Sequence, residues 1–161
     1  LIGDGPAMPE LRRFAVAHNL ERDVIFMGPL PHEEMHRCAE LIDVAVQPAA
    51  NEYCCPMKIL EYMALEQPIV QYDLLEGRRS AEGASLYAEP NNVKDFATKI
   101  EELLADPEKR KQMGQLGRER MENSLEWRHQ VPKLLKAYEQ TLHPATKKTS
   151  PVQSEQSEAN S

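Results

Sequence analysis

The sequence predicts an α/β fold, a doubly wound parallel sheet that is followed by C-terminal helices. Two observations support this prediction. Over residues 1–88, short apolar runs alternate with amphipathic segments of helix length, and beyond residue 88 only helix-like segments follow. Strands that are separated by helices pair in parallel and are joined by right-handed crossovers.

The composition is that of a globular protein of the cytoplasm. The 161 residues are 41% hydrophobic and 28% charged, which suits one domain with a sizeable core. A net charge of −7 argues against nucleic acid as a partner. No apolar run approaches the roughly 20 residues of a membrane span. Three cysteines, of which Cys54 and Cys55 are adjacent, favour reduced thiols over a disulfide framework.

The first part of the chain is expected to alternate strands and helices. The expected strands cover residues 1–3, 24–27, 44–46, 69–72 and 85–88, which are short runs rich in apolar residues. The expected helices cover residues 9–19, 32–41 and 57–65. In the first of these helices, four residues at helical spacing are expected to face the core: Leu11, Phe14, Ala15 and His18.

The second part is expected to hold three helices and a disordered tail. Asn92 caps the first helix, whose apolar face comprises Val93, Phe96, Ala97, Ile100, Leu103 and Leu104. Asp106-Pro107 begins the second helix as a cap followed by a proline, and Trp127 begins the third. Residues 1–142 form the expected domain. Residues 143–161 contain too few apolar residues to fold and are expected to be disordered.

Ligands of open parallel sheets bind at the carboxyl ends of the strands. Four loops are expected at that edge and are candidate walls of one cleft: residues 3–6, 28–31, 47–56 and 72–83. Within the last of them, residues 73–81 form a charged segment. This segment is expected to be either a solvated loop or part of the mouth of the site, lined by Glu76 and the backbone of Gly77.

The most informative segment is Cys55-Pro56-Met57-Lys58-Ile59-Leu60-Glu61-Tyr62-Met63-Ala64. A helix that begins here offers unpaired N–H groups and the positive end of a dipole, which together bind phosphate. Lys58 is unfavourable to that dipole unless an anion lies beside it. Glu61 shares the helix face of Lys58 and could accept hydrogen bonds from a sugar diol. The alternative is an ordinary surface ion pair, worth a few tenths of a kcal/mol.

Three other motifs carry less weight. Gly3-Asp4-Gly5 lacks the third glycine of a dinucleotide-binding loop, because Met8 stands in that place. Cys54 and Cys55 lack the C-x-x-C spacing of a zinc site, and no histidine is near them in sequence to act as a base. His32-Glu33-Glu34-Met35-His36 matches the H-E-x-x-H pattern of metalloproteases, but no third ligand is evident. No metal or other cofactor is therefore expected.

A longer series of segments then points to a family. In order, it comprises Leu1-Ile2-Gly3-Asp4-Gly5-Pro6, Val24-Ile25-Phe26-Met27-Gly28-Pro29-Leu30-Pro31-His32-Glu33-Glu34, Asp43-Val44-Ala45-Val46-Gln47-Pro48, Met57-Lys58-Ile59-Leu60-Glu61-Tyr62-Met63-Ala64, Gln67-Pro68-Ile69-Val70, Leu86-Tyr87-Ala88, Asp106-Pro107 and the helix at Trp127. In this order and spacing, residues 1–142 resemble the C-terminal, donor-binding domain of a family 4 retaining glycosyltransferase. Such a domain is the Rossmann-like half of the GT-B fold. The H-E-x-x-H match falls within the series and is a coincidence.

The resemblance implies a transferase that moves a sugar from a nucleotide-sugar to an acceptor, with retained anomeric configuration and without a metal. Glu61 corresponds to the second glutamate of the family's E-x7-E motif, which binds the ribose hydroxyls. Pro29 and Leu30 match the segment that contacts the base, and Lys58 and the backbone near Met57 match the diphosphate region. The acceptor domain is expected to precede Leu1, so this chain alone is expected to be inactive. That missing part could also bring the protein to the inner face of the membrane.

The chain departs from the family pattern at two places. Tyr53 stands where the first glutamate of E-x7-E is expected, and Glu52 lies one residue earlier. The segment Glu52, Tyr53, Cys54 and Cys55 is expected to contact the donor sugar. Leu65-Glu66-Gln67 lacks the glycine of the family's Ala-Gly-Lys. Two alternatives remain: a sugar-nucleotide epimerase or phosphorylase of the same architecture, and a degenerate binding domain, which the loss of the glutamate favours.

Overall fold

A computed structural model describes residues 1–49, 51 and 57–142 of the chain. The chain divides into two compact units, Leu1–Met121 and Glu122–Ser161. The expected disordered tail, residues 143–161, lies outside the described residues.

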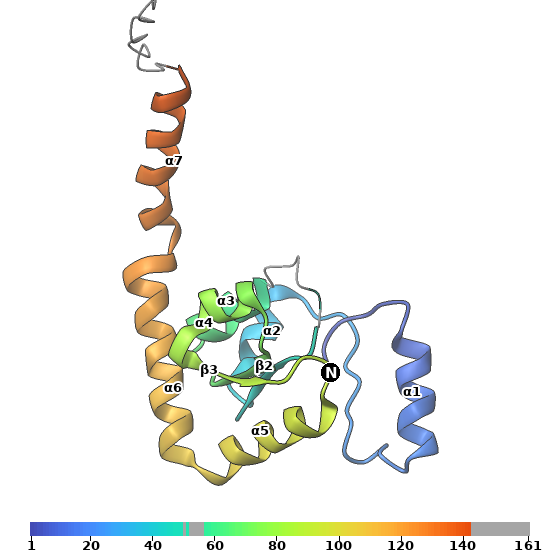
Figure 1. The fold of residues 1–161 in the computed structure, drawn as a ribbon. Coiled ribbons are helices and arrows are strands. Elements are labelled where there is room, and N and C mark those ends of the chain that lie inside the picture. The colour runs from blue at the N-terminus through green and yellow to red at the C-terminus, as the bar shows by residue number, and fades with distance from the viewer. Residues whose placement is uncertain (50, 52–56, 143–161) are drawn as a thin grey trace, which may run out of the picture. The chain divides into compact units, whose positions relative to one another are not determined.

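The centre of the first unit is a parallel sheet of three strands (Figure 1). The strands are β1 (Ala45–Gln47), β2 (Ile69–Tyr72) and β3 (Ser85–Ala88). They lie in the order β1-β2-β3, so that β2 pairs in parallel with both neighbours. The α/β class is thus confirmed, as are three of the expected strands to within one residue.

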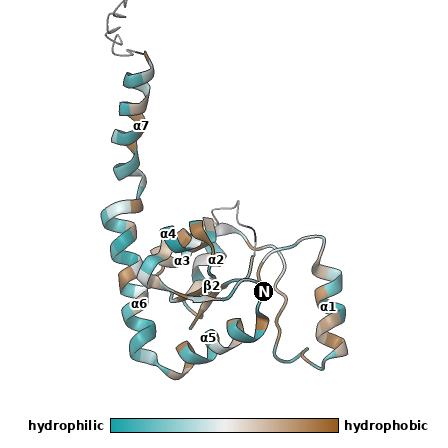
Figure 2. Ribbon diagram, viewed as in Figure 1, coloured by the Kyte–Doolittle hydropathy of each residue, from teal (hydrophilic) through white to brown (hydrophobic). Residues whose placement is uncertain are grey.

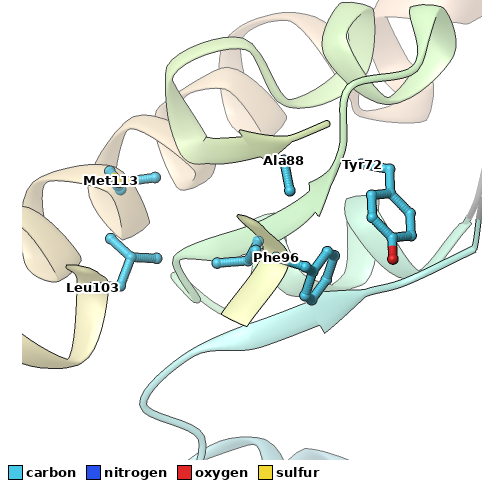
Figure 3. Close-up of a cluster of buried hydrophobic side chains, with 6 residues drawn as sticks. Tyr72, Ala88, Phe96, Leu103 and Met113 are labelled. Atoms are coloured by element: carbon cyan, nitrogen blue, oxygen red, sulfur yellow. The ribbon is translucent and has the colours of Figure 1, made fainter. Parts of the chain in front are cut away.

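Helices cover both faces of this sheet. Helix α5 (Val93–Ala105) packs against β2 and β3, while α3 (Met57–Ala64) and α4 (Leu75–Ala81) lie on the other side of the strands in Figure 1. On the α5 side, a buried cluster comprises Val70, Tyr72, Ala88, Phe96, Leu103 and Met113 (Figure 3). The rings of Tyr72 and Phe96 meet edge to face, with their centroids 4.9 Å apart.

The caps expected in the second part of the chain are present. The Asn92 side chain accepts a hydrogen bond from the backbone N–H of Asp95 at 3.1 Å and begins α5. The Asp106 carboxylate accepts one from the N–H of Lys109 at 2.9 Å, and Pro107 follows it as the first residue of α6 (Pro107–Arg120). Such caps satisfy N–H groups that a helix leaves unpaired.

The expected apolar face of α5 is narrower than the sequence indicates. Phe96 and Leu103 are buried, and Ile100 packs against the cluster. Val93, Ala97 and Leu104, however, are exposed, so their assignment to the core is wrong. Successive helix positions lie roughly 100° apart, so Leu104 points away when Leu103 faces the sheet. Val93 occupies the open first turn of the helix.

Helix α6 packs on α3 through two glycines rather than through large apolar side chains, and in Figure 2 it is mostly hydrophilic. A Cβ atom on Gly114 would lie 2.1 Å from the carbonyl oxygen of Glu66. One on Gly117 would lie 3.1 Å from Cγ of Met63. The absence of side chains at both positions therefore sets how closely the two helices approach.

Residues 73–81, expected as a loop, mostly form a helix, which corrects the sequence interpretation. They contain α4 and are followed by a short 3-10 turn, η1 (Glu82–Ala84). The residues that face inward, Gly77 and Ala81, are small and buried. Glu76 and Arg79 pair on the outer side, with 3.1 Å between Oε1 and Nη1. Because the inner face holds no large apolar side chain, the sequence of α4 does not show the apolar periodicity that predicts a helix.

The amino-terminal part differs most from expectation. It holds α1 (Met8–Ala17) and α2 (His32–Ala39). Residues 1–3 pair with the segment 24–28 only in an isolated parallel bridge, Ile2 to Gly28, and Ile25 and Met27 are exposed. The buried strand expected at residues 24–27 is therefore wrong. The partner of residues 24–27 is the three-residue segment Leu1–Gly3, which is too short to form a ladder. Met27 N–H, for example, donates to the Leu1 oxygen at 2.9 Å.

The inward face expected for α1 is also mostly wrong. Ala15 is buried, but Leu11, Phe14 and His18 are exposed. The ring of Phe14 instead packs against that of His18, with 4.2 Å between their centroids. Without a ladder at residues 24–27, the described chain offers this helix no broad apolar surface to cover.

The second unit is described from Glu122 to Leu142. Its helix α7 (Trp127–Leu142) follows a π-helical turn, η2 (Met121–Leu125). Side chains of α7 bond back to that turn: Arg128 donates to the Glu122 oxygen and Gln130 to the Ser124 oxygen, each at 2.8 Å. This helix begins at Trp127, as predicted, and its apolar residues are largely exposed, among them Trp127, Leu134, Leu135, Tyr138 and Leu142.

Gly114→Ala is expected to destabilise the protein by at least about 2 kcal/mol, because the added methyl group meets backbone that cannot rotate away. Gly83→Ala is the control. Its Cβ would lie 3.4 Å from Cδ1 of Leu116, an ordinary contact, so we expect a change within about 0.5 kcal/mol. Urea denaturation measures both changes. Equal midpoints for the two variants would contradict the close approach of α6 and α3.

Candidate functional site

The carboxyl ends of the three strands define one edge of the sheet. The strands end at Gln47, Tyr72 and Ala88, and they are parallel, so these ends lie together. Helix α3 connects the end of β1 to the start of β2 and therefore begins at this edge. The N-terminal turn of α3, with Lys58, thus lies where open α/β sheets bind ligands.

Lys58 and Glu61 come together on α3 as predicted. Nζ of Lys58 lies 3.8 Å from Oε2 of Glu61, and about half of each side chain is exposed, 51% and 43%. An exposed pair at this distance stabilises a helix by only about 0.3–0.5 kcal/mol. Neither oxygen of Glu61 accepts a hydrogen bond from any residue in the described part of the chain. Both groups therefore remain available to a ligand.

The opposite face of α3 anchors it to the protein. Ile59 and Met63 are fully buried, so the spacing of four residues holds Lys58 and Glu61 on the outer side. Tyr62 is partly buried, and that burial, with a smaller contribution from the charge of Glu61, raises the pKa of its hydroxyl.

The C-terminal end of α3 closes in a Schellman motif. Gln67 N–H donates to the Tyr62 oxygen at 2.9 Å and Glu66 N–H to the Met63 oxygen at 3.1 Å. Glu66 takes the left-handed conformation, with φ of 56°. This is the position at which the family pattern shows glycine, and the backbone conformation explains that preference. The chain keeps the turn in spite of its glutamate.

A pocket opens between the carboxyl ends of β1 and β2 and the start of α4. It is lined by Gln47, Ala49, Asn51, Gln71, Tyr72, Leu74 and Gly77. The described lining carries three carboxamides and no charged side chain. Such a lining suits a neutral group that can both donate and accept hydrogen bonds.

Gln71 forms the buried part of this pocket. It is 2% exposed, and its Nε2 donates to the Gly77 oxygen at 3.4 Å, a long hydrogen bond. A Cβ atom on Gly77 would lie 2.2 Å from Oε1 of Gln71. The amide of Gln71 can therefore lie against α4 only because residue 77 is glycine.

A charged network holds the segment between β2 and β3. Arg78 donates to both oxygens of Asp73, at 2.7 and 2.5 Å, and its guanidinium lies over the ring of Tyr87 at 4.3 Å. The hydrogen bond from Arg78 lowers the pKa of Asp73. Burial raises the pKa of Tyr87 to about 12. Arg120 of α6 adds hydrogen bonds to the backbone oxygens of Ser80 and Arg79, each at 2.7 Å.

Three of the remaining predicted residues are described, and they lie before α2 and at the start of α3. Pro29 and Leu30 lie on the segment that leads into α2, where Pro29 is exposed and Leu30 half-buried. Met57, at the start of α3, is exposed. Four residues assigned to the donor sugar, Glu52, Tyr53, Cys54 and Cys55, lie outside the described residues.

The four expected loops form two groups. The loops at residues 3–6 and 28–31 are joined where the N–H of Gly3 donates to the Gly28 oxygen at 2.7 Å. The parts of the chain that follow β1 and β2 meet in the pocket of Gln47 and Gln71. Sequence reasoning missed that pocket, although one signal was present. Gln71 is a polar residue inside the apolar run of a central strand, and such a residue needs a partner.

The part of the chain that the structure describes holds neither a metal-binding cluster nor a membrane-spanning helix. Three or more His, Cys, Asp or Glu side chains do not gather there into a group that could hold a metal ion. No helix within the same residues is long and apolar enough to cross a membrane.

The chain belongs to the family of glycosyl transferases group 1, which its residues 1–120 match. It is 30% identical over 117 residues to an alpha-D-kanosaminyltransferase of Streptomyces kanamyceticus. That match covers 71% of this chain and 30% of the relative, so the chain spans about a third of that protein's length.

Solved structures share the fold. Sucrose-phosphate synthase from Thermosynechococcus elongatus superposes with a TM-score of 0.80 at 23% identity, over 90% of this chain and 38% of that one. TarM of S. aureus, as a G117R mutant in complex with fondaparinux, alpha-GlcNAc-glycerol and UDP, gives 0.75 at 21% identity, over 85% and 28%. These similarities support the GT-B architecture expected from the sequence.

Glu66→Gly is expected to stabilise the protein by about 0.5–1 kcal/mol, because glycine adopts the left-handed conformation without steric cost. Asn91→Gly is a matched control. Asn91 also has a positive φ, of 62°, but asparagine tolerates that region, so its replacement is expected to change stability less. Thermal unfolding of both variants gives the comparison. A loss of stability in Glu66→Gly would show that the Glu66 side chain contributes more than its backbone costs.

Gly77→Ala is expected to destabilise the protein by about 1–3 kcal/mol, because the methyl group displaces the Gln71 amide. In a Gln71→Ala background the same change should cost little or even stabilise, since alanine favours a helix over glycine by about 1 kcal/mol. A double-mutant cycle by denaturation measures this coupling. Additive effects would contradict the contact between the two residues.

Proposed function

We propose that this chain is the donor-binding part of a retaining glycosyltransferase that takes its sugar from a nucleotide-sugar. In this proposal the start of α3 binds the diphosphate, with Lys58 beside the backbone N–H groups of the first turn. Glu61 accepts hydrogen bonds from the ribose hydroxyls, and Leu30 with Pro29 contacts the base. The rest of the protein supplies the acceptor site.

The observation that carries the proposal is the exposed carboxylate of Glu61, which accepts no hydrogen bond from the described residues. This carboxylate lies at the ligand-binding edge of the sheet and is half exposed. A pair of carboxylate oxygens is matched to the two hydroxyls of a ribose. Lys58, 3.8 Å away, adds the positive charge that a diphosphate needs.

The relatives support this choice of substrate. One is named for the transfer of a kanosaminyl group. TarM, whose fold this chain shares, has been solved with UDP. A nucleoside diphosphate is the common leaving group when a sugar is transferred from a nucleotide-sugar. A donor-binding domain therefore needs a site for a nucleoside diphosphate.

The proposed chemistry rests on the leaving group. When the bond between the sugar and the diphosphate breaks, negative charge grows on the diphosphate oxygens. Preorganised donors stabilise such developing charge more than they stabilise the bound substrate. Lys58 and the helix N-terminus provide the positive charge in this proposal, which therefore needs no metal ion. Retention of configuration is part of the proposal and follows the family 4 resemblance.

Glu61→Ala is expected to weaken the binding of UDP or GDP by about tenfold, because two hydrogen bonds to the ribose are lost. Calorimetry with this chain measures the affinity. Glu102→Ala is the control, because Glu102 also pairs with a lysine three residues before it, Lys99, at 3.8 Å, and it pairs in addition with Lys109. It lies on α5, away from the site, so its removal should leave nucleotide affinity unchanged.

Equal affinities in the original chain and Glu61→Ala would exclude the ribose role. Binding of neither nucleotide by the original chain would count against the whole proposal. Product analysis of the full-length protein separates the alternatives. A glycosylated acceptor supports the transferase, an epimerised donor supports the epimerase, and inactivity on all common nucleotide-sugars supports a degenerate binding domain.

A further inference from the structure

The buried amide of Gln71 has an acceptor that none of the described residues uses. Its nitrogen donates to the Gly77 oxygen, whereas its Oε1 accepts no hydrogen bond from the described residues. In the described part of the chain, every side-chain oxygen or nitrogen that is fully shielded from solvent has a hydrogen-bond partner. Oε1 must therefore keep a small exposed surface, and the surface available to Gln71 is the pocket that it lines.

An unused acceptor in a buried strand is costly unless something donates to it. The other buried polar residue of the sheet shows the usual arrangement. Ser85 donates its hydroxyl to the Ile69 oxygen at 3.1 Å and to the Leu86 oxygen at 3.0 Å. Gln71 lies on the neighbouring strand with one half of its amide satisfied. A donor to Oε1 therefore has to come from the pocket, either from solvent or from a ligand group that takes the place of solvent.

The pocket selects the chemistry of that donor. Gln47, Asn51 and Gln71 bring carboxamides, and the described lining holds neither a cation nor an anion. An unpaired carbonyl oxygen repels a phosphate oxygen, so the diphosphate does not fit here. A hydroxyl or an amide N–H of a neutral group does fit.

We propose that this pocket receives a hydroxyl or amide group of the transferred sugar and that Oε1 of Gln71 accepts its hydrogen bond. This inference rests on the proposed function. It agrees with the order of the chain: Asn51 at the pocket leads to Met57 and Lys58, where the diphosphate would lie. The sugar is bonded to that diphosphate. Gln71 thus contributes to the choice of sugar but not to the affinity for the nucleotide.

The test compares two ligands in each variant. Calorimetry measures the affinity of the chain for UDP and GDP and for their glucose, N-acetylglucosamine and mannose derivatives. For the derivative that binds best, the ratio of its affinity to that of the parent diphosphate is the readout. Gln71→Met, which keeps the size of the side chain but not the acceptor, is expected to lower this ratio about fivefold or more. The affinity for the parent diphosphate should stay within about twofold, since its contacts are intact.

Two further variants keep the test decisive. Ser85→Ala removes a buried polar group on the adjacent strand that does not line the pocket, so it should leave the ratio unchanged. Gln47→Leu removes another carboxamide of the pocket without touching Gly77 and serves if Gln71→Met does not fold. It should lower the ratio as well.

The outcomes separate this inference from the proposed function. If the original chain binds neither diphosphate, both are wrong. If it binds the diphosphate but gains nothing from any of the sugars, the inference is wrong and the nucleotide site stands. The same holds if Gln71→Met and Gln47→Leu keep the original ratio.

Discussion

The burial of β2 on both faces is the constraint on which the rest of the structure depends. Val70 and Tyr72 face the cluster under α5, while Ile69 and Gln71 face the other side, and all four are buried. A strand in this position is normally apolar throughout. Gln71 breaks that rule, and α4 accommodates it, because Gly77 leaves room for the amide and offers its carbonyl oxygen. Gln71 thereby becomes one of the residues that line the pocket at the edge of the sheet.

The position of Lys58 and Glu61 depends on contacts at the far end of α3. Buried Ile59 and Met63 fix the rotation of the helix. Its C-terminal turn, with Glu66 in the left-handed conformation, lies against Gly114 of α6. Because helices are stiff, a shift of α6 there would move the charged pair at the ligand-binding edge. Two residues remote from any substrate, Glu66 and Gly114, therefore bear on the geometry of the site.

Much of the first unit could be predicted because its signals are local. The caps at Asn92 and Asp106 and the apolar runs of β1, β2 and β3 are read directly from the sequence. Helix α4 could not, because its inner face consists of small residues without an apolar period. The strand expected at residues 24–27 failed for another reason. A run of apolar residues shows that a strand is favourable, but the ladder also needs a partner, and Leu1–Gly3 supplies only a bridge there. The Gln71 pocket needs residues from β1, β2 and α4 together, which local patterns do not show.

The chemistry of the edge divides by charge. Lys58 and the start of α3 form its positive part, next to an available carboxylate, whereas the pocket at the carboxyl ends of β1 and β2 is lined by neutral amides in the described residues. A nucleotide-sugar has the same division, since a charged diphosphate joins a neutral sugar to a ribose. Affinity for the charged part changes little with the sugar, so it cannot by itself discriminate among sugars. Discrimination has to come from directional hydrogen bonds to hydroxyl and amide groups, and buried acceptors give the largest penalties when such a bond is missing. Within a family whose members transfer different sugars, variation is thus expected at the neutral pocket rather than at Lys58 and Glu61.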